Sequence, residues 1–325
     1  MIPITASPAF VACVPAYLAH WRALGRRYRQ EAWLLQTLLR ELPALGHDDL
    51  NAQSFALWFE VRKDRHPNSR RKWAQLIRHF CVFRHRAEPD CFVPDPEQVC
   101  RRQPYVVPVI VNEQQIARLL AAADRLNPSS NSLLRPAAMR LAIVLLYTTG
   151  MRLGELQRLE LRDVESDGTI LRIRNSKFQK TRLLPLSVTT QAEVQRFLKL
   201  RASAGFNQRP DAALLCTRPA SKAGYSIPGL QGGINALFHA ALIVDFCGRF
   251  PRIHDLRHSF AVQVLARSYR RGDDVQAVLP KLSMYMGHVS IESTAYYLQW
   301  TEELGALASE RFAHEFSHVI AGGLS

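Results

Sequence analysis

Two tyrosines stand side by side near the C-terminal end of the chain, in the stretch IESTAYYLQW at residues 291–300. A tyrosine phenol can attack a phosphate ester once a neighbouring base takes its proton. On a helix, neither Tyr296 nor Tyr297 falls on the side that the apolar residues of this stretch share. The local pattern therefore leaves open which of the two tyrosines, if either, is a nucleophile.

A second group of reactive side chains lies in RIHDLRHSFAVQVL, residues 252–265. His254, Arg257 and His258 are three and four residues apart, so a helix brings them to one side. A histidine can accept a proton, and an arginine offers paired donors to a phosphate. Two histidines at this spacing also suit zinc, but the metalloprotease pattern has glutamate after the first histidine, where this chain has Asp255. We therefore expect neither a metal ion nor another cofactor.

Two further stretches could supply charge to a site. In TTGMRLGEL, Arg152 stands in the turn before a helix, where an anion is already attracted, and Glu155 can buttress a nearby side chain. In RNSKFQKTRLLPL, Lys177 lies in a turn between two strands, from which an ammonium group can reach into a cleft. Taken alone, each pattern is more typical of an exposed surface.

The elements that must position these residues fall into two parts. Residues 10–87 repeat apolar side chains every three to four positions, which predicts a small helical bundle. Five prolines between residues 88 and 111 predict an extended linker. Beyond it, Asn112 is expected to cap a helix, and more helices surround two short strands. We predict a mainly α (α+β) fold with domains at residues 1–103 and 104–325.

The charge of the chain points to a polyanionic partner. Lys and Arg number 42 against 28 acidic residues, and arginine dominates the excess. The stretch Arg70-Arg71-Lys72 opens a helix, where free backbone N–H groups also favour phosphate. The apolar run AIVLLY is too short to cross a bilayer, and the six cysteines form no CxxC pair. We expect a cytosolic protein that binds nucleic acid.

Five of these features occur in a fixed order. They are TTGMRLGEL, the lysine of the strand turn, HDLRHSF, the sequence MGH at residues 286–288, and a tyrosine nine positions after His288. Together they resemble the tyrosine recombinases, the phage integrase family, over most of residues 113–300. The helical first domain is similar to the core-binding domain of that family. The resemblance implies a core-binding helical bundle followed by a helical catalytic domain with a small antiparallel β-sheet.

The resemblance also implies a role for each candidate. Tyr297 would be the nucleophile, with Tyr296 as its packing neighbour, and Lys177 would be the acid, with Lys180 as the alternative lysine. The remaining site residues would be the two phosphate-binding arginines, their supporting acid, and two histidines: Arg152, Arg257, Glu155, His254 and His288. Further candidates for contact with DNA are Arg70, Arg71, Lys72, Lys180 and Arg182.

The family reaction cuts and rejoins DNA through a 3′-phosphotyrosyl link, inside a tetramer on double-stranded DNA. The resemblance therefore implies a recombinase or integrase for DNA integration, excision or transposition. Residues 302–320 are expected to form an amphipathic helix that docks on a neighbouring subunit or packs on its own domain. The rival hypotheses are a type IB topoisomerase, a catalytically silent DNA-binding protein and a zinc hydrolase on His254 and His258.

Overall fold

The computed structural model describes residues 5–98, 106–165, 168–174 and 181–287, together with Gly305 and Ser309. The chain divides into two compact units, Met1–Val106 and Val107–Ser325, and each unit has its own core. The described residues are mostly helical and include a small antiparallel sheet, which confirms the predicted fold class. None of the helices in these ranges is long and apolar enough to cross a membrane.

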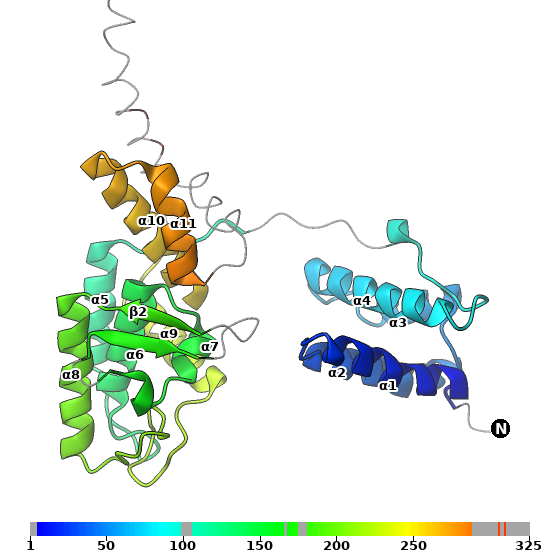
Figure 1. Cartoon of the computed structure of the whole chain (residues 1–325), viewed down its shortest axis with the longest axis horizontal. Coiled ribbons are helices and arrows are strands. Elements are labelled where there is room, and N and C mark those ends of the chain that lie inside the picture. The colour runs from blue at the N-terminus through cyan, green and yellow to red at the C-terminus, as the bar shows by residue number, and fades with distance from the viewer. Residues whose placement is uncertain are drawn as a thin grey trace, which may run out of the picture. The chain divides into compact units, whose positions relative to one another are not determined.

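The first unit is a bundle of helices (Figure 1), and its core is rich in aromatic side chains. Local capping fixes where helices begin: Ser7 accepts a hydrogen bond from the N–H of Phe10, and Asn51 and Ser54 cap each other. Within residues 5–98 the elements are α1 (Pro8–Ala23), α2 (Arg29–Glu41), α3 (Ala52–Glu60) and α4 (Pro67–His85), with 3-10 turns at Pro43–Leu45 and Pro96–Gln98. The large buried side chains of the core include Phe10, Tyr17, Trp58 and Phe80.

This bundle also buries an arginine. The side chain of Arg84 on α4 is only 6% exposed. Its two terminal nitrogens donate to both carboxylate oxygens of Asp49, at 2.6 and 2.7 Å, and one of them also donates to Glu88 at 2.6 Å. Hydrogen bonds from Arg84 to Asp49 and Glu88 raise the pKa of the Arg84 guanidinium above its ordinary value. Two carboxylates therefore neutralise this cation inside the fold.

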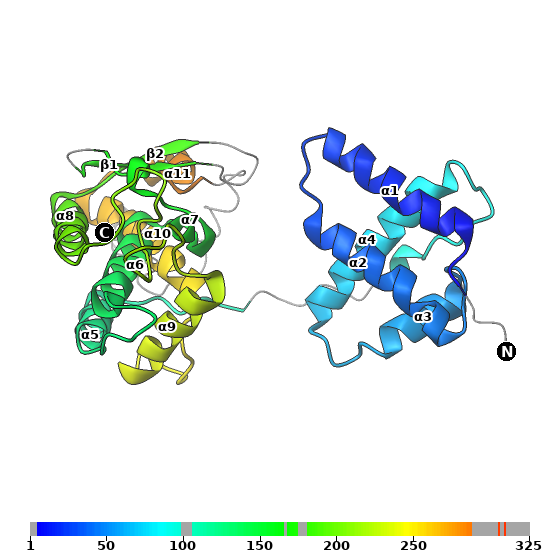
Figure 2. The ribbon, with the colours of Figure 1, turned by 90° about the horizontal axis from the view of Figure 1, so that it is seen from below.

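The second unit packs helices around α6, which is labelled among α5, α8, α9 and α10 in Figure 2. Ten of the fifteen residues of α6 are buried, because it contacts helices on several sides. The elements of the described part of this unit are α5 (Glu113–Asp124), α6 (Arg135–Thr149), α7 (Leu153–Gln157), a 3-10 turn (Leu161–Asp163), β1 (Ile170–Ile173), β2 (Arg182–Pro185), α8 (Val188–Ser203), α9 (Ile227–Ala240), α10 (Ile253–Arg271) and α11 (Val275–Met286). Asn112 caps α5, as predicted.

The two strands pair antiparallel, with Ile170 opposite Pro185 and Ile173 opposite Arg182. The connection between them, predicted to carry the hairpin lysine, includes residues 175–180, which lie outside the described residues. β2 also contacts α11, so the hairpin is held against the last helix of the described chain. This contact places the first residue of β2 next to the end of α11.

Three helices in the described part of this unit end at glycines with a left-handed backbone, and two of these glycines pack closely against neighbouring residues. Gly150 follows α6 with φ 61°, and Gly287 follows α11 with φ 68°. A side chain at either position would be strained, and it would also collide with neighbours. A Cβ at position 150 would lie 2.5 Å from the ring of Phe260, and one at 287 would lie 2.9 Å from Arg182. Both helix ends therefore lie unusually close to other parts of the unit.

Candidate active site

Arg152 and Glu155 form the first part of the candidate site, at the beginning of α7. The carboxylate of Glu155 accepts from the backbone N–H of Arg152 at 2.9 Å and from its guanidinium at 2.9 Å. Glu155 is almost fully buried, whereas the side chain of Arg152 remains 29% exposed. Glu155 thus holds both the backbone and the guanidinium of Arg152, and part of the Arg152 side chain remains accessible to solvent.

Glu155 has a second cationic partner that comes from the hairpin. The terminal nitrogens of Arg182 donate to its two oxygens at 3.0 and 2.8 Å. Burial alone would raise the pKa of Glu155, but the hydrogen bonds from Arg182 and Arg152 outweigh it and hold the pKa at about 2. Glu155 is therefore ionised at any physiological pH and shared between two arginines.

Arg257 on α10 completes a group of three arginines. Its side chain lies in the interior, where it donates to the backbone carbonyls of Gly150 and Met286. The bond to Met286 measures 2.8 Å. Because Gly150 directly follows α6 and Met286 ends α11, this guanidinium lies between the C-terminal ends of two helices. The last carbonyls of a helix lack partners within the helix and carry its partial negative charge, so they suit a buried cation.

Three successive carbonyls at the end of α11 accept hydrogen bonds from three arginines. These are the carbonyls of Tyr285, Met286 and Gly287, at 2.9, 2.8 and 3.0 Å from their donors. The donors, in the same order, are Arg182, Arg257 and Arg152. Residues separated by more than a hundred positions in the sequence therefore converge on the segment that leads directly into His288. We call this arrangement the arginine clasp.

The histidines of α10 lie beside the clasp. The rings of His254 and His258 meet edge to face, with centroids 4.8 Å apart. By surface area His254 is exposed; the protein atoms packed around its ring and the nearby Arg257 nevertheless lower its pKa to about 4. Burial and the neighbouring His254 likewise bring the pKa of His258 to about 4. Both imidazoles are therefore neutral at pH 7, and a neutral imidazole can accept a proton.

A buried acid aligns the start of α10. Asp255 accepts from the backbone N–H of Arg252 at 2.9 Å and from its guanidinium at 2.8 Å. It also accepts from the N–H of Val109 at 3.4 Å, while Ser259 accepts from the N–H of Val111 at 2.8 Å. The segment that enters the second unit is thus fastened to the helix that carries His254 and Arg257. Among the described residues, no group of three or more His, Cys, Asp or Glu side chains is placed to hold a metal ion.

Comparison with known proteins identifies the family of the chain. The family model described as "Phage integrase family" matches residues 110–303. The inferred integrase/recombinase y4rE of Sinorhizobium fredii is 31% identical over 298 residues, which cover 92% of this chain and 94% of that protein. The chain belongs to the phage integrase family.

Solved structures show the same fold at low sequence identity. The integrase of transposon Tn1549, in complex with transposon right end DNA, matches 93% of this chain and 99% of its own, with a TM-score of 0.62 at 17% identity. A lambda integrase tetramer bound to a Holliday junction matches 88% of this chain and 76% of its own, with a TM-score of 0.58 at 18% identity. By family, the chain is a tyrosine-type site-specific recombinase.

The structure brings together several residues that the family resemblance had selected. Arg152, Glu155, His254 and Arg257 all belong to the clasp or lie beside it. The other candidates of the second unit lie outside the described residues: Lys177, Lys180, His288, Tyr296 and Tyr297. The matched family region includes all of these positions, and their roles stay predictions.

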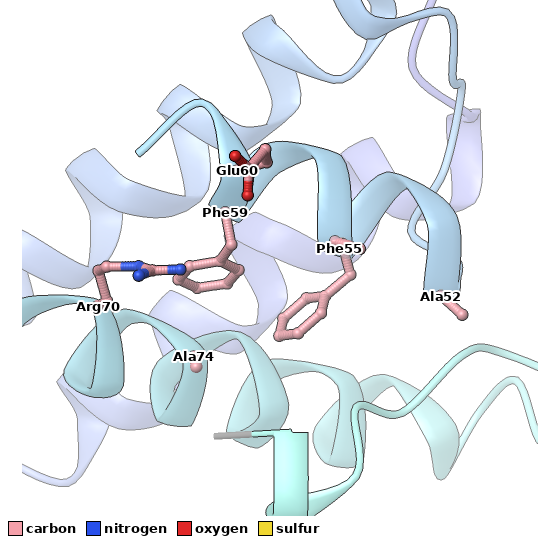
Figure 3. Close-up of a pocket in the computed structure, with 7 residues that line it drawn as sticks. Ala52, Phe55, Phe59, Glu60, Arg70 and Ala74 are labelled. Atoms are coloured by element: carbon pink, nitrogen blue, oxygen red, sulfur yellow. The ribbon is translucent and has the colours of Figure 1, made fainter. Parts of the chain in front are cut away.

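The basic candidates of the first unit have different surroundings. Lys72 is exposed on α4, and Arg71 is partly buried. Arg70 extends along Phe59 at a groove between α3 and α4 that Phe55 and Ala74 also line (Figure 3). The Nε of Arg70 is buried and has no hydrogen-bond partner among the residues that the structure describes. Their predicted contact with DNA stays a prediction.

Sequence reasoning missed the place of Arg182 in the fold. It had appeared only as a candidate for DNA contact, yet its side chain is just 12% exposed and its donors reach Glu155 and the end of α11. Sequence reasoning also missed that backbone carbonyls would hold Arg257. The glycines of TTG and MGH, each directly after a helix, were the available signal for these close approaches.

Proposed function

We propose that this recombinase cuts and rejoins double-stranded DNA through a 3′-phosphotyrosyl intermediate on Tyr297. The observation that carries the proposal is the convergence of Arg152 and Arg257 on the two carbonyls that directly precede His288. A phosphodiester under attack gains negative charge on its non-bridging oxygens, and fixed guanidinium groups stabilise that charge. The overall excess of basic residues supports a polyanionic substrate.

The chemical step assigns a proton path to the remaining residues. The phenolic oxygen of Tyr297 forms a bond to phosphorus while the bond from phosphorus to the 5′ oxygen breaks. His254 takes the phenolic proton, and Lys177 gives a proton to the leaving 5′ oxygen. The neutral state of His254 at pH 7 suits a proton acceptor, and a bound phosphate raises its pKa by placing a negative charge nearby.

The second half of the reaction reverses these steps with another strand. A 5′-hydroxyl attacks the phosphotyrosyl linkage, Tyr297 leaves, and the phosphodiester is restored. Since one ester replaces another, the reaction consumes no nucleotide cofactor. His288, the residue after Gly287, would donate to the phosphate, and Glu155 would keep Arg152 in place.

The relatives suggest how the reaction is used. The y4rE protein is named as an integrase/recombinase, and the Tn1549 enzyme is a transposon integrase in complex with a transposon end. Lambda integrase forms a tetramer on a Holliday junction. We propose that this chain likewise assembles as a homotetramer on two duplexes, and that it integrates, excises or transposes a DNA segment.

The proposal is tested by trapping the covalent intermediate. Purified protein would be incubated with nicked duplexes taken from the ends of the DNA segment that encodes it, so that the cleaved strand diffuses away. We expect a protein–DNA adduct whose peptide map identifies Tyr297, and its loss in Tyr297→Phe but not in Tyr296→Phe. An adduct that survives Tyr297→Phe contradicts the assignment. Relaxation of supercoiled plasmid without strand exchange would instead indicate a topoisomerase.

A further inference from the structure

Arg182 connects three segments that carry candidate catalytic residues. It begins β2, five residues after Lys177 in the sequence, and it faces Ile173 across the sheet. Its terminal nitrogens donate to Glu155, which holds Arg152, and its Nε donates to the carbonyl of Tyr285 at 2.9 Å. Its hydrogen bonds thus join Glu155 directly to the body of α11.

We propose that Arg182 is a positioning residue of the recombinase site. It ties the hairpin that carries Lys177 to Glu155, and it ties both to the end of α11, two residues before Gly287 and three before His288. This inference rests on the proposed function, because the catalytic roles of Lys177 and His288 belong to it. Arg182 does not itself meet the DNA in this assignment; it acts through the groups that do.

The geometry requires an arginine in particular. A guanidinium presents two nitrogens side by side to a carboxylate and a third, Nε, in another direction. Arg182 uses the pair on Glu155 and Nε on the Tyr285 carbonyl. A lysine has a single ammonium group, so it cannot hold both partners at these distances. Gly287 packs so closely against Arg182 that a Cβ there would lie within 2.9 Å of its terminal nitrogen.

The burial of Arg182 separates this role from a direct contact with phosphate. An arginine that binds DNA phosphate keeps donors toward solvent and releases counterions when DNA binds. The side chain of Arg182 is only 12% exposed, and protein acceptors already take three of its donor positions. Removing a positioning residue should therefore slow cleavage while it leaves the affinity for DNA and its dependence on salt unchanged.

The first arm of the test measures the Glu155 carboxylate in the free protein. The charged side chains that face it are Arg152 from its own helix and Arg182 from β2. Carbon-13 NMR of glutamate-labelled protein, assigned with Glu155→Gln, would follow the titration in wild type, Arg182→Gln and Arg182→Lys. We expect the pKa of Glu155 to rise by about 1–3 units in Arg182→Gln, since its burial is then offset by one cation only. Arg182→Lys should show a smaller rise.

The second arm measures cleavage of the nicked duplexes under single-turnover conditions. Arg182→Gln should cleave about 10- to 100-fold more slowly than wild type, because the groups around the phosphate lose their alignment. Its rate should fall further at acid pH, where Glu155 becomes protonated, and this acid loss should vanish in the double variant with Glu155→Gln. Arg182→Lys should recover part of the rate. Arg196→Gln is the matched control, since Arg196 is an exposed arginine that pairs with Glu193 on α8.

The outcomes are distinct. An Arg182→Gln variant that cleaves at the wild-type rate, or whose Glu155 titrates as in wild type, contradicts the positioning role. A salt dependence of DNA binding that weakens by about one counterion shows a phosphate contact instead and also contradicts it. If wild type forms no adduct on any duplex, the proposed function fails, whereas the Glu155 titration still decides whether Arg182 holds this carboxylate. If Arg182→Gln is too unstable to study, the Glu155 titration and the cleavage rate are both measured on Arg182→Lys, with the same directions expected.

Discussion

Each unit of this protein buries arginine side chains, and Arg84 in the first unit and Arg257 in the second are held in different ways. In the first unit, Arg84 donates to two carboxylates, Asp49 and Glu88. In the second unit, Arg257 donates to the carbonyls of Gly150 and Met286. Carboxylates cancel the charge of a guanidinium, whereas carbonyls orient it and leave its charge in place. The comparison sets a cation held by carboxylates beside one that donates to backbone carbonyls and to which the proposed function assigns a phosphate.

The surroundings of the arginine clasp extend this contrast. Arg152 and Arg182 share the single carboxylate of Glu155, and their remaining described contacts are to backbone carbonyls. The described clasp thus contains three arginines and one ionised acid, which leaves an excess of positive charge beside the candidate catalytic residues. In the proposed function, the phosphodiester of the DNA supplies the balancing negative charge.

The largest effect on cleavage should come from exchanging Arg257 for methionine. Arg257→Met should reduce cleavage per folded molecule by about 10²- to 10³-fold, as expected when one fixed donor to a developing negative charge is lost. Single-turnover cleavage of the nicked duplex measures this loss, with the folded fraction determined by circular dichroism.

The matched exchange in the first unit is Arg84→Met. It should destabilise that unit by about 3 kcal/mol, because the carboxylates of Asp49 and Glu88 lose a shared partner. Cleavage per folded molecule should stay at the wild-type level. If Arg84→Met and Arg257→Met reduced cleavage per folded molecule equally, the assignment of Arg257 to the active site and of Arg84 to the fold would be contradicted.

A smaller effect is expected at two glycines that share a left-handed backbone. Gly25 in the first unit has φ 77° and open space around it, whereas Gly287 has φ 68° and contacts Arg182. Alanine should cost about 1 kcal/mol of unfolding free energy at either site from backbone strain alone. Gly287→Ala should in addition slow cleavage by about tenfold, since the new methyl group displaces the Arg182 guanidinium.

Thermal melting and single-turnover cleavage of the two glycine variants test this expectation. If Gly25→Ala and Gly287→Ala lose the same stability and both cleave normally, the close packing at the end of α11 has no catalytic consequence.

The smallest effect concerns pH. In the folded protein His254 and His258 have pKa values of about 4, below the ordinary 6.5, so protonation favours the unfolded chain. Their contribution to stability is full above pH 6.5 and is lost as the pH falls toward 4. In the first unit the pKa of Asp49 is lowered from its ordinary 3.8, so protonation of Asp49 reduces the stability of the fold only below about that pH.

Hydrogen exchange resolved by peptide should therefore show α10 losing protection between pH 6.5 and 4, before the effect of Asp49 reaches the first unit. The double variant His254→Gln/His258→Gln should weaken this dependence on pH. A loss of α10 protection that persists unchanged in that variant would exclude these histidines as its source.

Local features of the fold could be predicted from the sequence because their causes are local. Apolar residues every three to four positions produced helices, and the side chain of Asn112 capped α5 as its neighbours required. The two glycines after helices were visible in the sequence, although their close neighbours were not. The convergence of Arg152 and Arg257 was expected from the family motifs, since nothing in their spacing brings them together.

The surroundings of Arg182 could not be predicted in the same way. An arginine at the end of a basic hairpin is usually exposed, and its burial here depends on Glu155, 27 positions earlier, and on a carbonyl 103 positions later. Such a contact follows from the packing of β2 against α11, which no local pattern encodes. The carbonyl partners of Arg257 could not be predicted from the sequence either, because every residue has a backbone carbonyl whatever its side chain.

The fastening of residues 109–111 to α10 has a mechanical consequence. Asp255 and Ser259 hold the N–H groups of Val109 and Val111 from inside the helix that also carries His254 and Arg257. A force on the segment that enters the second unit at residues 107–111 is therefore transmitted directly to α10, and not to a peripheral loop. A displacement of residue 107 would therefore act on the helix that carries the imidazole of His254 and the guanidinium of Arg257. Leu256, which lies between these two residues in the sequence, is buried and anchors the helix in the core.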